Sequence, residues 1–187
     1  MVSEILLPAG FALLRSEFSR ESFSVSGLIR YFSYGSNMHR SIFEDRRGMR
    51  PIRAQPAVLA NYRLCFNLPV GRGERGVANL ESHEGARVRG VRYLITTERA
   101  EHLDRTEGVP SGVYRRIAVN AIVDSGEEIE GFTYQSDKIS LGLKPSPRYI
   151  ALLVEGAVQH GLPPDYIHYL RSFELAVDER LSEPQRS

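Results

Sequence analysis

The sequence has little net charge, a single cysteine and no tryptophan. Lysine and arginine number 24 against 23 acidic residues, so the net charge is +1. Such a balance provides no strong field to attract nucleic acid or an anionic membrane surface. We therefore expect neither as a partner and favour a small neutral or zwitterionic ligand. The lone cysteine, Cys65, excludes an internal disulfide, which is consistent with a reducing cytosol, and we expect a cytoplasmic protein.

Long apolar runs are also missing. The apolar segment 5–14 is too short to span a bilayer and contains Pro8 and Gly10. No basic residue precedes it, and Glu4 stands where a secretory signal would be positive. We expect neither a membrane-spanning segment nor a secretory signal.

The usual metal ligands do not occur at metal-binding spacings. The five histidines include no His-x-x-x-His pair with a nearby carboxylate. Cys65 lies in the apolar run 62–66, where a core side chain is a simpler interpretation than a nucleophile. We expect no metal and no cofactor.

The residues that are present suffice for one domain. At 187 residues and 42% hydrophobic content, the chain is long enough to bury one core. We expect a poorly defined N-terminal extension at 1–27, a single domain at 28–178 and a flexible tail at 179–187. The oligomeric state expected for such a domain is a monomer or a homodimer.

Hydrophobic periodicity predicts strands followed by helices. Alternating or continuous apolar residues predict a first strand near Ile29 and further strands at 58–67, 76–81, 87–95, 113–123 and 127–135. Helical spacing predicts helices at 98–107, at 146–161 and from 163 onward, with Ser146 as a cap and Pro147 in the first turn. The expected fold class is α+β: a small curved or closed, mainly antiparallel β-barrel flanked by helices.

The stretch from Tyr31 to Asn37 joins a strand pattern to a helix start. Its aromatic residues are typical of a strand, which ends at Gly35. Ser36 and Asn37 are favourable N-cap residues and predict a short helix after them. The first N–H groups of a helix lack partners within it, and glycine allows close approach to the backbone. The turn therefore predicts a site for a carboxylate or an oxyanion, although such turns are also common as purely structural junctions.

Glu107 is the candidate general base. Ala100, Leu103 and Glu107 are spaced i, i+3, i+7, which places the glutamate on the apolar side of the predicted helix. Burial and the C-terminal end of the helix dipole both favour the protonated form, so the pKa is expected to be raised, as a base working near neutrality requires. The alternative is a structural glutamate that binds a backbone N–H, Arg115 or Arg116. Asp104 is expected to face water.

Two motifs resemble those of the γ-glutamylcyclotransferase family. The run 31–37 is similar to the N-terminal signature of that family, and Leu103-Asp104-Arg105-Thr106-Glu107-Gly108-Val109 is similar to its second motif. The resemblance extends from Leu28 to about Leu170 and implies a γ-glutamylcyclotransferase-like fold with Glu107 as the catalytic residue. The substrate-binding residues that it implies are Tyr31, Phe32, Ser33, Tyr34, Gly35, Ser36, Asn37, Tyr114 and Tyr134.

The resemblance implies that a γ-glutamyl donor cyclises and releases 5-oxoproline with a free amino acid or amine. The nucleophile is the substrate's own α-amino group, so no catalytic cysteine or serine triad is required. Asn37 stands where the glutathione-specific branch typically has leucine, which favours γ-glutamyl amino acids or amines as donors. Arg50 and Arg53 are candidates for contacting a substrate carboxylate. Two alternatives remain: a non-catalytic binding module of the same fold, and a biosynthetic cyclase that removes a γ-glutamyl protecting group from a larger amine.

Overall fold

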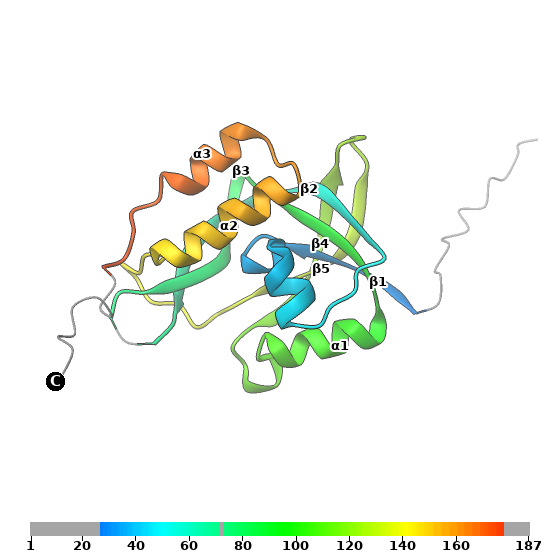
Figure 1. Cartoon of the computed structure of the whole chain (residues 1–187), viewed down its shortest axis with the longest axis horizontal. Coiled ribbons are helices and arrows are strands. Elements are labelled where there is room, and N and C mark those ends of the chain that lie inside the picture. The colour runs from blue at the N-terminus through cyan, green and yellow to red at the C-terminus, as the bar shows by residue number, and fades with distance from the viewer. Residues whose placement is uncertain (1–26, 72, 178–187) are drawn as a thin grey trace, which may run out of the picture.

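Five strands form a closed barrel. The computed structural model describes residues 27–71 and 73–177, so the predicted tail 179–187 and all of the predicted extension except Gly27 lie outside the described residues. The strand order is β1-β3-β2-β4-β5 (Figure 1). The strands are β1 (Leu28–Ser33), β2 (Arg53–Pro69), β3 (Gly76–Thr96), β4 (Arg115–Val123) and β5 (Glu128–Gln135).

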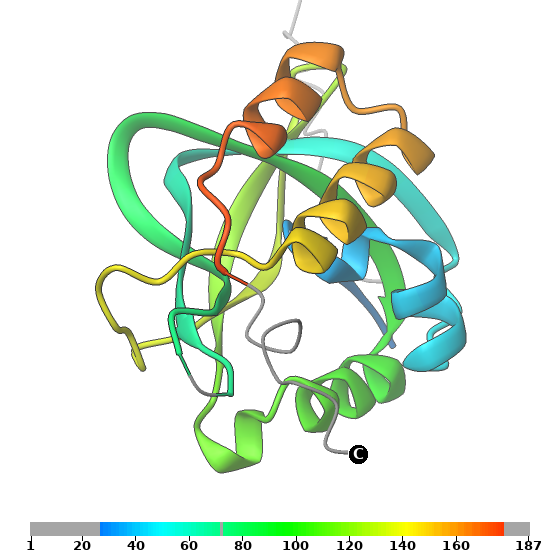
Figure 2. The ribbon, with the colours of Figure 1, turned by 60° about the vertical axis from the view of Figure 1, so that its left-hand side comes forward.

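The pairing of these strands confirms the predicted fold class. All neighbours are antiparallel except β1 and β5, which close the barrel through a parallel contact between Tyr31 and Phe132 (Figure 2). A tight turn connects β4 to β5, where Gly126 N–H donates to the Val123 carbonyl at 2.8 Å.

Strand β3 is longer than predicted, because it joins two segments that the sequence pattern separates. The polar residues between 81 and 87 resemble a turn, but they remain within the strand as an irregularity. Ala60 pairs with Arg87 and Tyr62 pairs with Ser82, so the register with β2 shifts between these positions. Asn61 stands at the shift with a φ of 61°, and its side chain accepts from Gly85 N–H at 3.0 Å. The side-chain contact stabilises a bulge that periodicity alone does not reveal.

Three α-helices and three short helical turns surround the barrel. The predicted cap Ser146 is confirmed, since it accepts from Tyr149 N–H at 3.2 Å. Thr96 caps another helix in the same way and accepts from Arg99 N–H at 3.2 Å. None of the described helices is long and apolar enough to cross a membrane. The helical elements are η1 (Ser36–Met38), η2 (Ser41–Arg46), α1 (Thr97–Thr106), η3 (Val109–Ser111), α2 (Pro147–Gln159) and α3 (Pro164–Arg171).

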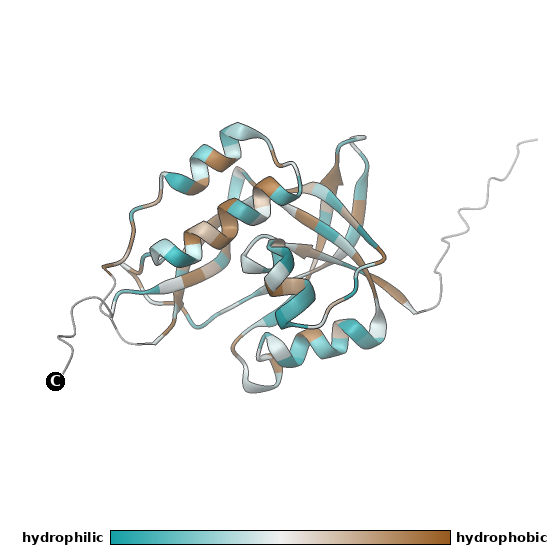
Figure 3. Ribbon diagram, viewed as in Figure 1, coloured by the Kyte–Doolittle hydropathy of each residue, from teal (hydrophilic) through white to brown (hydrophobic). Residues whose placement is uncertain are grey.

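Helix α2 positions the turn that follows β1. Figures 1 and 2 show α2 and α3 along one side of the barrel, with η1 and η2 between α2 and α1. Helix α2 is more apolar along its length than α1 (Figure 3) and buries Leu153 and Ala157. Gly156 allows its close approach, because a Cβ there would lie 2.7 Å from the Met38 carbonyl carbon and 2.7 Å from the His39 nitrogen. The core therefore fixes the position of the predicted signature turn.

Candidate active site

A small cavity lies beside the turn between β1 and η1. Its volume is about 150 Å³, below the range of about 300 to 1,000 Å³ typical of sites for drug-sized ligands. It brings together two motifs that are 70 residues apart in the sequence, since both Asn37 and Glu107 line it. The lining residues are Tyr31, Ser33, Tyr34, Gly35, Ser36, Asn37, Arg47, Val77, Ala78, Glu107, Tyr114, Tyr134 and Tyr149.

Of the predicted substrate-binding residues, only Phe32 does not line this cavity. Alternation along β1 sends Tyr31 and Ser33 to the cavity side and Phe32 to the opposite side. The Phe32 side chain is 1% exposed, and its ring would lie 2.8 Å from a Cβ at Gly90. Phe32 is therefore a core residue, whose ring packs against β3 at Gly90.

The turn itself differs from its predicted capping pattern. Gly35, not Ser36 or Asn37, is the N-cap of η1, and no side chain caps this turn. Gly35 is extended, with a φ of −115°, and a Cβ there would lie 3.3 Å from the Ala78 Cβ and 3.3 Å from the Tyr149 hydroxyl. Glycine suits this position because the turn packs closely against β3 and α2.

Asn37 connects the turn to the glutamate. Its side-chain amide donates to the Glu107 Oε1 atom at 2.8 Å and to the Tyr31 hydroxyl at 3.0 Å. The Tyr93 hydroxyl donates to the Asn37 carbonyl at 3.1 Å, which fixes the residue from the barrel side. The remaining side-chain atom, Oδ1, is buried and has no hydrogen-bond partner in the described chain. A buried acceptor of this kind is suited to a ligand donor, because leaving it unpaired is costly.

Glu107 is placed by the end of α1. It is the C-cap residue, its N–H donates to the Leu103 carbonyl at 2.9 Å, and Gly108 follows in the left-handed conformation with a φ of 70°. This geometry turns the side chain inward, where it is 10% exposed. Asn37 and Arg47 both contact Oε1, and no described residue bonds Oε2. The second carboxylate oxygen therefore remains for a ligand.

Burial raises the pKa of the Glu107 carboxyl, even though the Arg47 charge and the Asn37 hydrogen bond both act to lower it. The pKa is raised because desolvation of the carboxylate outweighs these two stabilising contacts. The predicted direction for Glu107 and its predicted burial are thus both found in the structure.

Arg47 was not singled out by the sequence. Its Nη2 lies 3.1 Å from Glu107 Oε1, and the side chain is 19% exposed. The wide turn of η2 brings it there, since Arg47 N–H donates to the Ile42 carbonyl five residues earlier at 3.0 Å. Arg50 and Arg53, the candidates from the same basic loop, do not line the cavity. A π-turn changes the direction in which the following side chains point. The composition of the loop therefore does not show that Arg47, and not Arg50 or Arg53, reaches Glu107.

Two tyrosine hydroxyls hold the opposite wall of the cavity at one residue, Ala78. The Tyr114 hydroxyl donates to the Ala78 carbonyl at 2.7 Å, and the Tyr149 hydroxyl accepts from the Ala78 N–H at 3.2 Å. Tyr114 was expected from the family motif. Tyr149 was not, since its place in the first turn of α2 gives no indication of which wall it faces.

The hydroxyl of Tyr134, another predicted site residue, donates to Asp104 Oδ1 at 2.8 Å. Asp104 Oδ1 also accepts a hydrogen bond from Arg116 Nε at 2.7 Å. The Asp104 side chain is only 23% exposed, so the expectation that it faces water was wrong. Arg115 pairs with Asp137 instead. Neither Arg115 nor Arg116 binds Glu107, and the arginine that pairs with it is Arg47.

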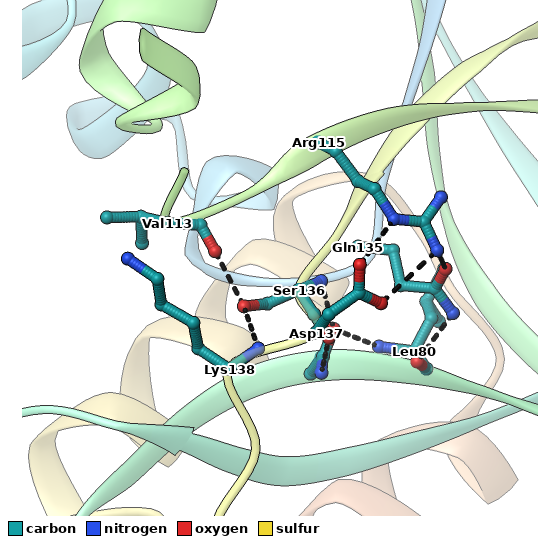
Figure 4. A network of polar contacts seen from close by, with 8 residues as sticks. Leu80, Val113, Arg115, Gln135, Ser136, Asp137 and Lys138 are labelled. Atoms are coloured by element: carbon teal, nitrogen blue, oxygen red, sulfur yellow. Dashed lines mark hydrogen bonds and ion pairs between the residues drawn. The ribbon is translucent and has the colours of Figure 1, made fainter. Parts of the chain in front are cut away.

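A second polar network holds the strand segment that carries this wall (Figure 4). Asn79, next to Ala78, accepts from the N–H groups of Leu80 and Ser136 at 2.9 Å each. Ser136 Oγ donates to the Val113 carbonyl at 2.6 Å. These contacts join β3 to the end of β5, so the wall is supported from both sides.

The cavity supplies one buried carboxylate, one arginine, amide groups and tyrosine hydroxyls. No group of three or more His, Cys, Asp or Glu side chains within residues 27–71 and 73–177 is placed to hold a metal ion. The arrangement is suited to proton transfer by Glu107 next to a site for a small polar molecule.

Comparison with known proteins gives the same family as the two motifs. A model of the AIG2-like family matches residues 87–170. A γ-glutamylcyclotransferase of Bos taurus is 32% identical over 151 residues, with 77% of this chain and 78% of that protein covered; its Homo sapiens counterpart is 30% identical with the same coverage. A solved γ-glutamyl cyclotransferase structure matches with a TM-score of 0.70 at 28% identity, over 80% of this chain and 89% of that chain. By sequence and by fold, the chain belongs to the γ-glutamylcyclotransferase family.

Proposed function

We propose that this protein is a γ-glutamylcyclotransferase that releases 5-oxoproline and an amine or amino acid from a γ-glutamyl donor, with Glu107 as the general base. The observation that carries the proposal is the meeting of Glu107 with the 35–37 turn across one small cavity. The cavity volume of about 150 Å³ suits the γ-glutamyl part of a donor better than a whole peptide.

The reaction needs an amine that is free of its proton. Glu107 accepts a proton from the donor's α-ammonium group, and the resulting amine attacks the γ-carbonyl carbon. The C–N bond of the γ-amide then breaks as the five-membered lactam closes. Two protons leave the α-nitrogen and two reach the departing nitrogen, so Glu107 ends in its starting state. The raised pKa of Glu107 suits both halves of this transfer.

Rate acceleration comes largely from holding the two ends of one molecule together. Intramolecular reactions with good orientation reach effective molarities of about 10⁵ M or more. We infer that the Asn37 Oδ1 atom accepts a hydrogen bond from the α-ammonium group, because this acceptor is buried beside Glu107 and unpaired in the described chain. The backbone of residues 35–37 binds either the α-carboxylate or the oxyanion that forms at the γ-carbonyl.

Product analysis tests the proposal. The enzyme is incubated with γ-glutamyl-alanine, a γ-glutamyl-lysine isopeptide and glutathione, and 5-oxoproline is quantified beside a Glu107→Gln variant. We expect 5-oxoproline from the amino acid or isopeptide donor, and about 10² to 10⁴-fold slower release from the variant. Absence of 5-oxoproline from every donor would favour a binding module, and turnover of the variant within tenfold of the parent would remove Glu107 from its role.

A further inference from the structure

A second and larger cavity adjoins the candidate active site. Its volume is about 600 Å³, against about 150 Å³ for the first. The two cavities share Val77 and Tyr149 as lining residues, so they meet at the wall formed by β3 and the first turn of α2. The remaining lining residues of the second cavity are Ser41, Ile42, Arg46, Val70, Arg75, Gly76, Ser146, Arg148 and Leu152.

The charged side chains that line this second cavity are all arginines. They are Arg46 from η2, Arg75 just before β3 and Arg148 from α2, and no aspartate or glutamate lines the cavity with them. None of the three forms an ion pair with a described residue. Arg75 Nε is buried and lacks a hydrogen-bond partner in the same part of the chain.

Some arginines elsewhere in the molecule are, by contrast, neutralised by a nearby carboxylate. Arg63, Arg115 and Arg116 each have a carboxylate within 3.0 Å. Glu74, the acidic residue next to Arg75, is engaged elsewhere, by Lys144 and by the Val177 N–H. Three cations that converge on one cavity from separate elements repel one another, which makes the cavity favourable for an anion.

The chemistry of the first cavity indicates what enters the second. If the γ-glutamyl part fills the small cavity, the amine beyond the scissile bond must extend past its wall. We propose that the arginine-lined cavity binds this leaving amine and selects donors whose amine carries carboxylate groups, such as an acidic amino acid or a short acidic peptide. This inference rests on the proposed function. Arginine recognises carboxylates through charge-assisted and often bidentate hydrogen bonds, which exceed neutral contacts in strength.

A pair of donors of nearly equal shape tests the inference. γ-Glutamyl-glutamate and γ-glutamyl-glutamine differ by one charge, and both release 5-oxoproline. We expect kcat/KM for the glutamate donor to exceed that for the glutamine donor by about tenfold or more, since one charge-assisted hydrogen bond is worth roughly that factor. The preference is expected to shrink in 0.5 M NaCl, because the cavity is open to solvent and its charges are screened.

Substitution of the arginines locates the preference. In Arg75→Gln and Arg148→Gln, and more strongly in the double variant, the ratio of kcat/KM between the two donors is expected to fall toward one. Arg63→Gln, which removes an arginine paired with Glu81 outside this cavity, is expected to leave the ratio unchanged. Thermal unfolding of each variant verifies that it is folded before kinetics are compared.

Binding separates the failure of this inference from the failure of the proposed function. In Glu107→Gln, titration calorimetry with the two donors is expected to give tighter binding of γ-glutamyl-glutamate. Equal kcat/KM values for the two donors in the parent, with 5-oxoproline formed from both, would overturn the subsite and leave the cyclotransferase proposal in place. No 5-oxoproline from any donor, with equal binding of both, would overturn the two proposals together.

Discussion

Two arginine–carboxylate pairs in this molecule have similar contact distances and opposite consequences. Arg47 Nη2 lies 3.1 Å from Glu107 Oε1, and Arg115 Nε lies 2.9 Å from Asp137 Oδ2. The pKa of Glu107 is raised, chiefly by burial, whereas the pKa of Asp137 is lowered, chiefly by its hydrogen bond from Arg115. The Glu107 side chain is 10% exposed and that of Asp137 is 74% exposed.

The difference shows that an arginine partner does not by itself decide the charge state of a carboxylate. At Asp137 water remains available, so the arginine adds a favourable contact at little cost. At Glu107 removal from water dominates, and the arginine offsets only part of it. The neighbouring residues reflect the same burial. Asn37 Oδ1, next to Glu107, is buried and has no hydrogen-bond partner in the described chain.

The largest expected effect is on catalysis. Glu107→Gln is expected to lower kcat for 5-oxoproline release by about 10² to 10⁴-fold, the range typical of a lost general base. Asp137→Asn removes a carboxylate from the exposed pair and is expected to leave kcat unchanged. Steady-state kinetics with γ-glutamyl-alanine compare the two variants. Equal losses in both would mean that the buried pair has no special role.

The next effect is on stability. Gly156→Ala places a Cβ against the backbone of Met38 and His39, and such overpacking is expected to lower the free energy of unfolding by about 1 to 3 kcal/mol. Because η1 must shift, the Asn37 to Glu107 contact is expected to weaken and kcat/KM to fall as well. Urea unfolding measures the first effect. Val158→Ala, on the exposed side of the same helix at 57% exposure, serves as the control and is expected to change stability by less than about 0.5 kcal/mol. Parent-like unfolding of Gly156→Ala would show that this packing is not limiting.

A smaller effect concerns the pH profile. Arg47 lowers the pKa of Glu107, so Arg47→Gln is expected to raise that pKa further. Since the base must be deprotonated, the acidic limb of kcat/KM against pH is expected to move to higher pH. Arg115→Gln removes the partner of Asp137 without touching Glu107 and is expected to leave the limb in place. A limb that moves to lower pH in Arg47→Gln would contradict the assigned role of the arginine.

The smallest effect is the pH dependence of unfolding, where the two pairs should have opposite signs. A carboxyl with a raised pKa binds more protons in the folded state, so its contribution to stability falls as pH rises from its unfolded pKa through its raised folded pKa. Glu107→Gln is therefore expected to gain stability relative to the parent across that window.

Asp137 has a lowered pKa, so its contribution to stability is present above its unfolded pKa and is lost as pH falls through its folded pKa. Asp137→Asn is thus expected to be less stable than the parent at neutral pH and to approach it in acid. Urea unfolding at several pH values checks both, and changes of the same sign would refute the contrast.

Sequence reasoning identified the parts of the site that depend on local pattern. The spacing of Glu107 from Ala100 and Leu103 predicted a buried side chain, and the structure has it buried as the C-cap residue of α1. The turn at Gly35 was found because glycine interrupts an aromatic strand. The contact of the Asn37 side chain with Glu107 was not predicted. Asparagine favours helix caps, but its amide can equally donate across a cavity, and only the tertiary structure decides between these two roles.

The remaining differences arise from long-range structure. Strand β3 continues through a polar segment because Asn61, on the neighbouring strand, stabilises the bulge. Arg47 reaches Glu107 because of the phase of a π-turn, and Tyr149 reaches Ala78 across 71 residues. None of these contacts can be predicted from hydrophobic periodicity in the sequence around the residues that form it.

The two backbone contacts of Ala78 have a consequence for how the protein is made. Its carbonyl is held from 36 residues away and its N–H from 71 residues away, and the second of these partners lies in a helix that begins only at Pro147. Contacts between such distant segments form late, because long loops must close first. During synthesis both signature motifs therefore emerge from the ribosome well before the residue that completes the cavity wall, and a chain interrupted before α2 would carry Glu107 beside an incomplete cavity.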